Sequence, residues 1–534
     1  MPQSPSSPPA RPQGLLKSSL VVSLMTLLSR VLGLTRDIVV ANFIGATIAA
    51  DVFFLAFKIP NFMRRLFAEG AFSQAFVPVL SEYRTQRTHE AVQNLINRVA
   101  GVLGGTLLLV TGFAVMGAPV IAAIFAPGFF LDEDPTRFTL ASEMIRITFP
   151  YLLLISLTGF CGAVLNSYGR FAVPAFTPVL LNLSLITAAL VIAPLFDVPA
   201  FALAWGVLAA GFIQLTFQLP FMVGIQLSPK PIWDLGDEGV RRVLTLMGPA
   251  IFGVSVSQIN LLLDTVLASF LPIGSISWLY YSDRLVELPL GVFAIAISTV
   301  ILPSLSRQQA SNSSENFRAT LDWAIRMVLF ISIPAALALI MLAKPILMTL
   351  FQYGALTIHD VSMASMSLQA YAVGLVAFML IKVLAPGYFS RQDMKTPVSI
   401  GIKAMLANMV LNVLFVVPLH YIWQLGHIGL ALATSIAACL NAGLLYNGLK
   451  KQNVYSALPG MVSFVARVLV AAVLMAFILR LMNPIDESWI SWGWWQRALN
   501  VGGLCAAGAF SYCAALALLG IRPSHFRVKI HNRE

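Results

Sequence analysis

The sequence predicts an all-α protein that crosses a membrane many times. Hydrophobic residues make up 58% of the 534 residues and charged residues only 11%, whereas a soluble globular protein carries about 25% charged residues. Apolar runs long enough to cross a hydrocarbon core of roughly 30 Å recur from Leu15 to Gly520. Because lipid offers the backbone no hydrogen-bond partner, such runs are expected to be helices.

Taken in order, the apolar runs predict 14 transmembrane helices. They span residues 16–41, 50–80, 96–126, 140–166, 172–194, 199–223, 243–270, 276–304, 321–351, 362–388, 397–417, 427–448, 461–482 and 496–519. Alternate connections carry Lys and Arg, among them Arg84, Arg170, Lys230, Arg307, Arg391 and Lys450, and the connections between them carry almost none. Basic loops mark the cytoplasmic side, so both termini are predicted to be cytoplasmic.

The basic residues of the chain do not indicate a nucleic-acid-binding protein. The formal net charge of +11 would suggest nucleic acid in a soluble domain. Here the basic residues lie in the short loops on one side of the membrane. The enrichment of Lys and Arg in cytoplasmic loops of membrane proteins explains this distribution.

The first twelve helices are predicted to form two parallel six-helix repeats. Short patterns around Pro78, Phe125 and Arg170 recur in the same order and at nearly constant spacing around Pro303, Phe351 and Arg391. Two halves of even helix count share one orientation, an architecture typical of alternating-access carriers with a central cavity. The predicted domains are a disordered leader (1–14), two lobes (15–225 and 226–455), two extra C-terminal helices (456–522) and a cytoplasmic tail (523–534).

Ionisable residues inside three predicted spans are the candidate functional residues, because charges at membrane depth are costly to bury. The first span holds Arg30, Arg36 and Asp37 in "LLSRVLGLTRDIVV", the second Lys58, Asn61, Arg64 and Arg65, and the eighth Ser277, Asp283, Arg284 and Glu287. Guanidinium groups bind phosphate with paired hydrogen bonds and stay charged at physiological pH. The set therefore favours a multivalent anion as ligand. The alternative is that the arginines pair with nearby acids, Asp37, Asp51, Asp283 and Glu287, and only lock helices together.

No enzyme or metal motif accompanies these charges. The stretch "HEAVQ" lacks the second histidine of a zinc site, and neither a P-loop nor a GxSxG sequence occurs. The four cysteines, Cys161, Cys439, Cys505 and Cys513, lie in apolar segments without CxxC spacing, which favours packing roles. The chain is predicted to be neither an enzyme nor a metalloprotein.

At the same residues the chain resembles the lipid II flippases of the MurJ (MviN) family, within the larger superfamily of multidrug, oligosaccharidyl-lipid and polysaccharide exporters. The matching stretches are "SRVLGLTRD", "ADVFFLAFKIPNFMRRLFAEGAFSQAFVPVLSEY", "GPAIFGVSVSQINLLLDTVLASFLPIGSISWLYYSDRLVELPLGV" and "KVLAPGYFSRQDMKTPV". The resemblance runs from about Leu15 to the C-terminus.

The resemblance implies a carrier that moves lipid-linked peptidoglycan precursor across a bacterial inner membrane. By position in the family pattern, Arg30, Arg36, Arg64 and Arg284 match required cavity arginines, and Ser29, Asn61, Ser277 and Glu287 match polar neighbours. Asp51 matches a motif acid after the first outer loop, and Asp37 is the candidate ion-pair partner within the first span. The last two helices match a groove for the lipid tail.

The expected partners are lipid II, membrane lipids and other cell-wall synthesis proteins, with no cofactor. The membrane potential or a monovalent cation such as sodium is the expected driving force, although the sequence reveals no ligands for such an ion.

Two other functions remain open from sequence. A multidrug or other lipid-linked oligosaccharide exporter of the same superfamily shares the fold, but an exporter of organic cations needs an excess of cavity carboxylates. A membrane-embedded cell-wall polymerase or scaffold needs an indispensable acid on the outer face.

Overall fold

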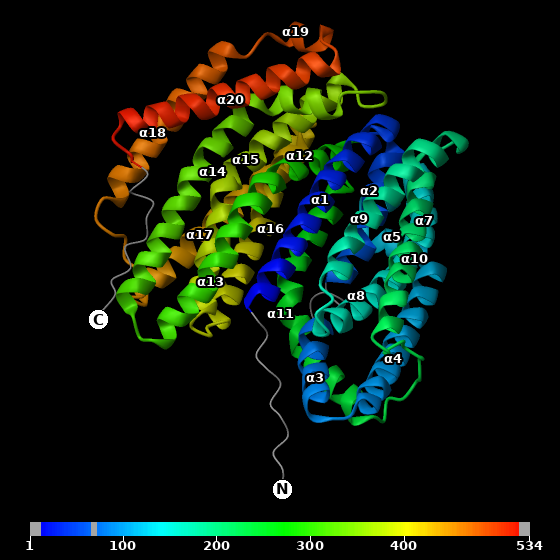
Figure 1. Cartoon of the computed structure of the whole chain (residues 1–534). Helices are drawn as coiled ribbons and strands as arrows, with labels where there is room; N and C mark the ends of the chain where they lie inside the picture. Colours follow the sequence, from blue (N-terminus) through cyan, green and yellow to red (C-terminus); the bar gives the residue numbers. More distant parts are fainter. Residues whose placement is uncertain (1–11, 66–71, 523–534) are drawn as a thin grey trace. The chain divides into compact units, whose positions relative to one another are not determined.

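The computed structural model describes residues 12–65 and 72–522, and all regular elements in these ranges are helices (Figure 1). The chain divides into two units. Unit 1 contains residues up to 44 together with 52–258, and unit 2 contains residues 45–51 together with those from 259 onward. Most of the predicted leader, the predicted tail and part of the matching stretch "RRLFAEGAFSQAFVP" lie outside the described residues.

Unit 1 is built from the first helices of the chain. They are α1 (Pro12–Ile44), α2 (Ile48–Arg64), α3 (Ser73–Gln86), α4 (His89–Met116), α5 (Ala118–Phe125), α6 (Pro127–Phe130), α7 (Thr136–Thr148), α8 (Tyr151–Ser167), α9 (Ala172–Thr187), the π-helical turn η2 (Ala188–Ile192), the 3₁₀ turn η3 (Ala193–Leu195) and α10 (Ala200–Gly224). The following α11 (Glu238–Ala268) begins in unit 1 and ends in unit 2.

Unit 2 holds the remaining elements. They are α12 (Ser275–Pro289), the π-helical turn η4 (Leu290–Ala294), α13 (Ile295–Ala310), α14 (Ser314–Phe351), α15 (Ile358–Phe389), α16 (Lys395–Trp423), α17 (Gly426–Lys451), α18 (Met461–Met482), α19 (Asp486–Ser491) and α20 (Trp494–Leu518). The first turn of α2 also belongs to this unit.

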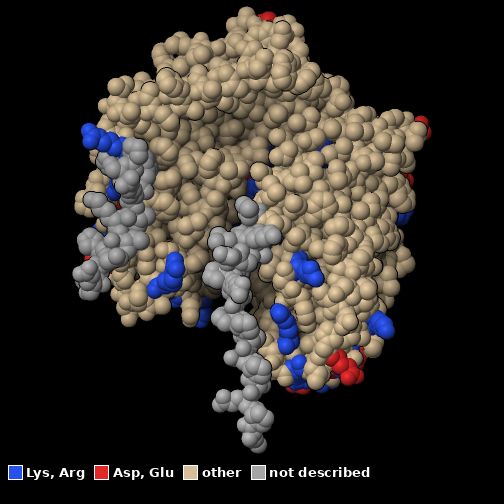
Figure 2. All heavy atoms as spheres, in the orientation of Figure 1, with Lys and Arg blue, Asp and Glu red and all other residues tan. Residues whose placement is uncertain are grey.

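The protein is a multi-pass membrane protein. Within the described residues, 11 helical segments are long and apolar enough to cross a membrane. They correspond to the predicted spans except those at residues 16–41, 50–80 and 243–270, so the total of 14 and the repeat remain predictions. Figure 2 shows a largely uncharged visible face, with Lys and Arg of unit 1 gathered over the part formed by α3 and α4.

Several predicted spans are helices with a break rather than single rods. The span at 96–126 is divided at Gly117 into α4 and α5, and the span at 140–166 is divided before Tyr151 into α7 and α8. In the span at 276–304, the π-helical turn η4 directly follows Pro289. Proline has no N–H for the helical ladder, so a locally widened turn is the expected accommodation.

Apolar packing holds each unit together. In unit 1 the rings of Phe72, Phe76 and Phe160 pack with centroids 5.1–6.1 Å apart and join a buried cluster of α3, α4 and α8. In unit 2, α18 and α20 pack on α14 and on each other (Figure 1). The Tyr512 hydroxyl on α20 donates to the Phe330 carbonyl on α14 at 2.8 Å, so the two helices beyond the predicted repeats are attached to α14.

Candidate functional site

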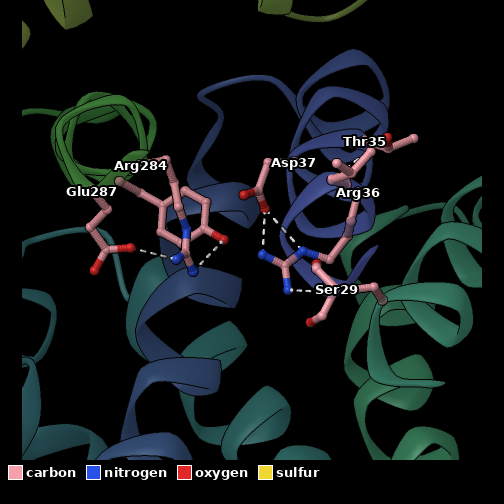
Figure 3. A network of polar contacts seen from close by, with 9 residues as sticks. Ser29, Thr35, Arg36, Asp37, Arg284 and Glu287 are labelled. Atoms are coloured by element: carbon pink, nitrogen blue, oxygen red, sulfur yellow. Dashed lines mark hydrogen bonds and ion pairs between the residues drawn. The ribbon is translucent and has the colours of Figure 1, made fainter. Parts of the chain in front are cut away.

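Arg36 and Asp37 on α1 form a buried ion pair. Arg36 Nε and Nη2 donate to Asp37 Oδ1 at 2.9 and 2.7 Å, and the two side chains point toward each other (Figure 3). Both residues are buried, with exposed fractions of 7% and 3%. The carboxylate therefore compensates much of the charge that α1 brings into the apolar part of the molecule.

Asn182 on α9 joins Arg36 to the preceding turns of α1. Its side-chain oxygen accepts from Arg36 Nη1 at 3.0 Å, and its side-chain amide donates to the Ser29 carbonyl at 2.9 Å. Ser29 and Arg36 are seven residues apart and share a helix face. Gly33 lies between them, where a Cβ would already contact Asn182 Nδ2 at 3.7 Å. A lone asparagine in the apolar run 172–194 was the only sequence signal for this contact.

Arg30 lies on another side of α1. It precedes Arg36 by six residues, which separates the two directions by roughly 120° on a helix, and α1 is continuous between them. Arg30 is half-buried and has no hydrogen bond or ion pair to the part of the chain that the structure describes. Its guanidinium group is therefore the member of the set with the least local compensation.

Arg64 and Asn61 lie one turn apart on α2, on the face that their spacing predicts. Arg64 Nε donates to Asn61 Oδ1 at 3.4 Å, and Asn61 Nδ2 donates to the Phe57 carbonyl at 3.0 Å. Both side chains are half-buried. The amide orients the guanidinium group without neutralising it.

Arg284 on α12 is paired with Glu287 in unit 2. Its Nη1 donates to Glu287 Oε2 at 2.9 Å and its Nη2 to the Tyr280 hydroxyl at 3.3 Å (Figure 3). The guanidinium also lies over the Tyr280 ring, 5.0 Å from the centroid. The Arg284 and Glu287 side chains are 34% and 46% exposed, so this ion pair is partly solvated and contributes little to stability.

Asp51 on α2 contacts Ser277 in the first turn of α12, and neither side chain reaches an open surface. Both residues are fully buried. Asp51 Oδ1 accepts from Ser277 N at 2.9 Å and Ser277 Oγ at 2.6 Å, and Asp51 Oδ2 accepts from Gly274 N at 2.7 Å. The carboxylate thus satisfies N–H groups that a helix start leaves without a partner, and it lies at the positive end of the helix dipole.

The segment that carries Asp51 is held at a second point. The Tyr281 hydroxyl donates to the Gly45 carbonyl at 2.9 Å. Gly45 has a φ of +59°, and a Cβ there would lie 2.5 Å from the Ala355 carbonyl oxygen. Only glycine fits this approach. Residues 45–51 are therefore fixed to unit 2 at both ends.

A polar cluster on α11, α16 and α17 was not predicted from the sequence. Asp264 Oδ1 accepts from Asn412 Nδ2 at 2.9 Å and Asn408 Nδ2 at 3.1 Å, and Asp264 Oδ2 accepts from Thr434 Oγ1 at 3.5 Å. Asn408 Nδ2 also lies 2.9 Å from Asn260 Oδ1. We call these five residues the Asp264 cluster.

The Asp264 cluster has the oxygen donors that a hard cation requires. The side-chain oxygens of Asn408 and Asn412 are buried and accept no hydrogen bond from the described residues. Buried acceptors without donors are rare and call for an explanation, and carboxylate and amide oxygens are donors that hard cations prefer. In the described ranges, no group of three or more His, Cys, Asp and Glu residues suits a metal ion.

Comparison with known proteins extends over nearly the whole chain. The family model described as "Lipid II flippase MurJ" matches residues 40–492. A Vibrio cholerae protein named "Probable lipid II flippase MurJ" is 53% identical over 513 residues, 95% of this chain and 97% of its own. A Haemophilus influenzae protein of the same name is 50% identical over 516 residues, 95% of this chain and 100% of its own. The solved structure "Lipid II flippase MurJ, inward closed conformation" matches with a TM-score of 0.76 at 27% identity, covering 93% and 98% of the two chains.

Proposed function

The chain belongs to the lipid II flippase MurJ family, and from this premise we propose that it moves lipid II between the leaflets of a bacterial inner membrane. The transported molecule is a polyprenyl diphosphate that carries a disaccharide-peptide, and transport runs from the cytoplasmic to the periplasmic leaflet. The observation that carries the proposal is the set of four arginines on three apolar helices, of which Arg30 has no hydrogen bond or ion pair to the described residues and Arg284 is about one-third exposed, at 34%.

The proposed diphosphate ligands are Arg30, Arg36, Arg64 and Arg284. Guanidinium groups pair with phosphate oxygens through parallel hydrogen bonds, and low local polarity strengthens each bond. Asn182 and Asp37 position Arg36, and Asn61 positions Arg64. The backbone of Ser29 is held by Asn182. An exporter of organic cations would require carboxylates in excess, which is opposite to this set.

In the proposed cycle, two states of the carrier expose the arginines to the two sides of the membrane in turn. We assign Asp51 and Ser277 to the element that must separate for release, because their contact fixes the segment 45–51 to the start of α12. Such a contact can be made and broken without unfolding either helix. The α1, α2–α3 and α11 helices complete the proposed set of fourteen spans, and the basic loops support a cytoplasmic position for both termini.

We propose that a monovalent cation, sodium in the first instance, binds the Asp264 cluster during the return step. The orphaned oxygens of Asn408 and Asn412 support this assignment. The membrane potential is a second energy source, worth about 2.3 kcal/mol per elementary charge per 100 mV.

The test is transport by purified protein in vesicles that carry lipid II in one leaflet. The triple variant Arg30→Gln/Arg64→Gln/Arg284→Gln is expected to lose transport, because the diphosphate loses its strongest partners. The matched control changes three exposed arginines, Arg87, Arg146 and Arg480, to Gln and should retain transport. Wild-type rates in the first variant would refute anion binding by these groups.

A further inference from the structure

Unit 2 contains a pocket that is lined neither by the candidate arginines nor by the Asp264 cluster. It lies among α14, α15, α17 and α18, is open on one side and has a volume of about 440 Å³. Its walls are mostly aliphatic. Each of the four helices contributes lining residues, for example Ile325 from α14, Leu384 from α15, Gly443 from α17 and Val465 from α18. No residue of α20 lines it. The pocket is therefore distinct from any groove between α18 and α20.

One end of this pocket is basic. Arg318 precedes Ile325 by seven residues on α14, and Lys450 follows Gly443 by seven residues on α17. Residues seven apart lie on the same face of a helix, two turns away. Arg391 follows the end of α15 at Phe389. Three of the four surrounding helices thus place a cation beyond the same end of the pocket.

The connection between α17 and α18 gathers these cations. Arg318 Nε donates to the Ser456 carbonyl at 2.7 Å, and Arg391 Nη1 donates to Gln452 Oε1 at 2.7 Å. Both acceptors belong to residues 452–460, which lead from α17 into α18. The guanidinium groups of Arg318 and Arg391 therefore both bind the short segment 452–460.

The wall at this end is itself neutral. Tyr455 lines the pocket, and its hydroxyl donates to Asp322 Oδ1 at 2.8 Å. Asp322 is also paired with Arg326, whose Nε lies 2.6 Å from Asp322 Oδ2. Arg326 is compensated by Asp322, and the nearby Asp393 carboxylate offsets part of the charge of Arg391. The net positive charge at this end comes from Arg318, Lys450 and the remaining charge of Arg391.

We propose that this pocket binds an anionic glycerophospholipid that is not transported. One acyl chain fills the pocket, and the headgroup phosphate binds Arg318, Arg391 and Lys450. An aliphatic cavity accepts a hydrocarbon chain at little cost, and basic groups between helix ends bind lipid phosphate. The volume of about 440 Å³ is close to that of one ordinary acyl chain. The bound lipid would connect α18 to α14, α15 and α17, a role beyond the transport proposed above.

The first test fills the pocket without a steric clash. A Cβ at Gly443 meets no atom within 4 Å, and the same is true at Gly502 on the exposed side of α20. Native mass spectrometry of the full-length protein, titrated with phosphatidylglycerol, counts the bound lipids. Gly443→Leu should lose one tightly bound lipid relative to wild type, and Gly502→Leu should lose none. Equal retention by wild type and Gly443→Leu would overturn the proposal.

The second test uses Cys439, which is exposed and lines the pocket. In a Cys505→Ala/Cys513→Ala background the remaining Cys161 is buried, so a small maleimide reports on Cys439 alone. Phosphatidylglycerol vesicles should slow the reaction several-fold relative to phosphatidylcholine vesicles. This protection should disappear in Arg318→Gln/Arg391→Gln/Lys450→Gln, provided that its melting temperature shows that it is folded.

Two results of the second experiment would overturn the proposal. Equal protection by both phospholipids in the unchanged pocket would remove the role of the headgroup. Stronger protection by a polyprenyl diphosphate than by phosphatidylglycerol would assign the pocket to the tail of the transported substrate. Neither result would affect the proposed function, which the arginine variants test separately.

Discussion

The Asp51 carboxylate accepts hydrogen bonds from both the backbone N–H and the hydroxyl of Ser277, at 2.9 and 2.6 Å. The two residues are far apart in the sequence, yet this contact completes the first turn of α12. Helices usually receive such a cap from the residue just before them. Here Gly274 occupies that position and has no side chain to offer, so a distant residue supplies the acceptor.

Asp51→Asn should weaken this attachment more than Ser277→Ala does. The amide loses the charge that favours the helix N-terminus and can accept fewer hydrogen bonds, a cost of about 1–2 kcal/mol. Ser277→Ala leaves both backbone N–H contacts in place. Hydrogen–deuterium exchange of residues 45–51 and 274–281 should be accelerated strongly in the first variant and slightly in the second. Identical exchange in both variants and wild type would show that the cap does not hold the segment.

The Arg36–Asp37 pair should show strong coupling. Asp37→Asn removes the negative charge that accepts two hydrogen bonds from the buried Arg36 guanidinium group, and breaking a buried pair in this way costs about 3–5 kcal/mol. The double variant Arg36→Gln/Asp37→Asn removes both charges and should recover much of the lost melting temperature. Additive effects of the two single changes would mean that the pair is solvated and contributes little.

The helical architecture could be predicted from the sequence, because the thickness of the bilayer sets how many consecutive apolar residues a membrane-spanning helix needs. The breaks did not follow as readily. Pro289 could be seen as a disturbance, but the form that the helix would take beyond it, the π-helical turn η4, depends on packing in unit 2. The division of the chain near residue 258 depends likewise on which helices pack together.

The charged candidates were visible in the sequence because each is out of place in an apolar run. The Asp264 cluster was not recognised, since its members are single polar residues in three separate runs with no spacing that links them. The role of Asn182 could not be predicted for the same reason. The sequence also does not reveal which residues form hydrogen bonds with each other. Only the structure shows that Ser277 bonds to Asp51 and that Arg36 bonds to Asn182.

Glu287→Gln should strengthen binding of the lipid diphosphate. The change removes the carboxylate that competes for Arg284, and half-exposed pairs of this kind are worth about 0.2–1 kcal/mol, so affinity should rise by up to about fivefold. Arg284→Lys should weaken binding, because an ammonium group cannot form the paired bonds. Titration of purified protein with lipid II in detergent measures both. Weaker binding by Glu287→Gln would instead indicate that Glu287 contacts the headgroup itself.

Sodium should stabilise the wild-type protein through the Asp264 cluster. A cation that binds only the folded state raises the melting temperature with its concentration, so unfolding in sodium chloride should occur at a higher temperature than in choline chloride of equal ionic strength. Asp264→Asn should abolish this difference, because the site loses its charge, and Asn412→Leu should reduce it. Ser435→Ala is the matched control: Ser435 adjoins Thr434 on α17, but its hydroxyl donates to the Ala370 carbonyl at 2.7 Å. A sodium effect that persists in Asp264→Asn would place the cation elsewhere and leave the orphaned amide oxygens unexplained.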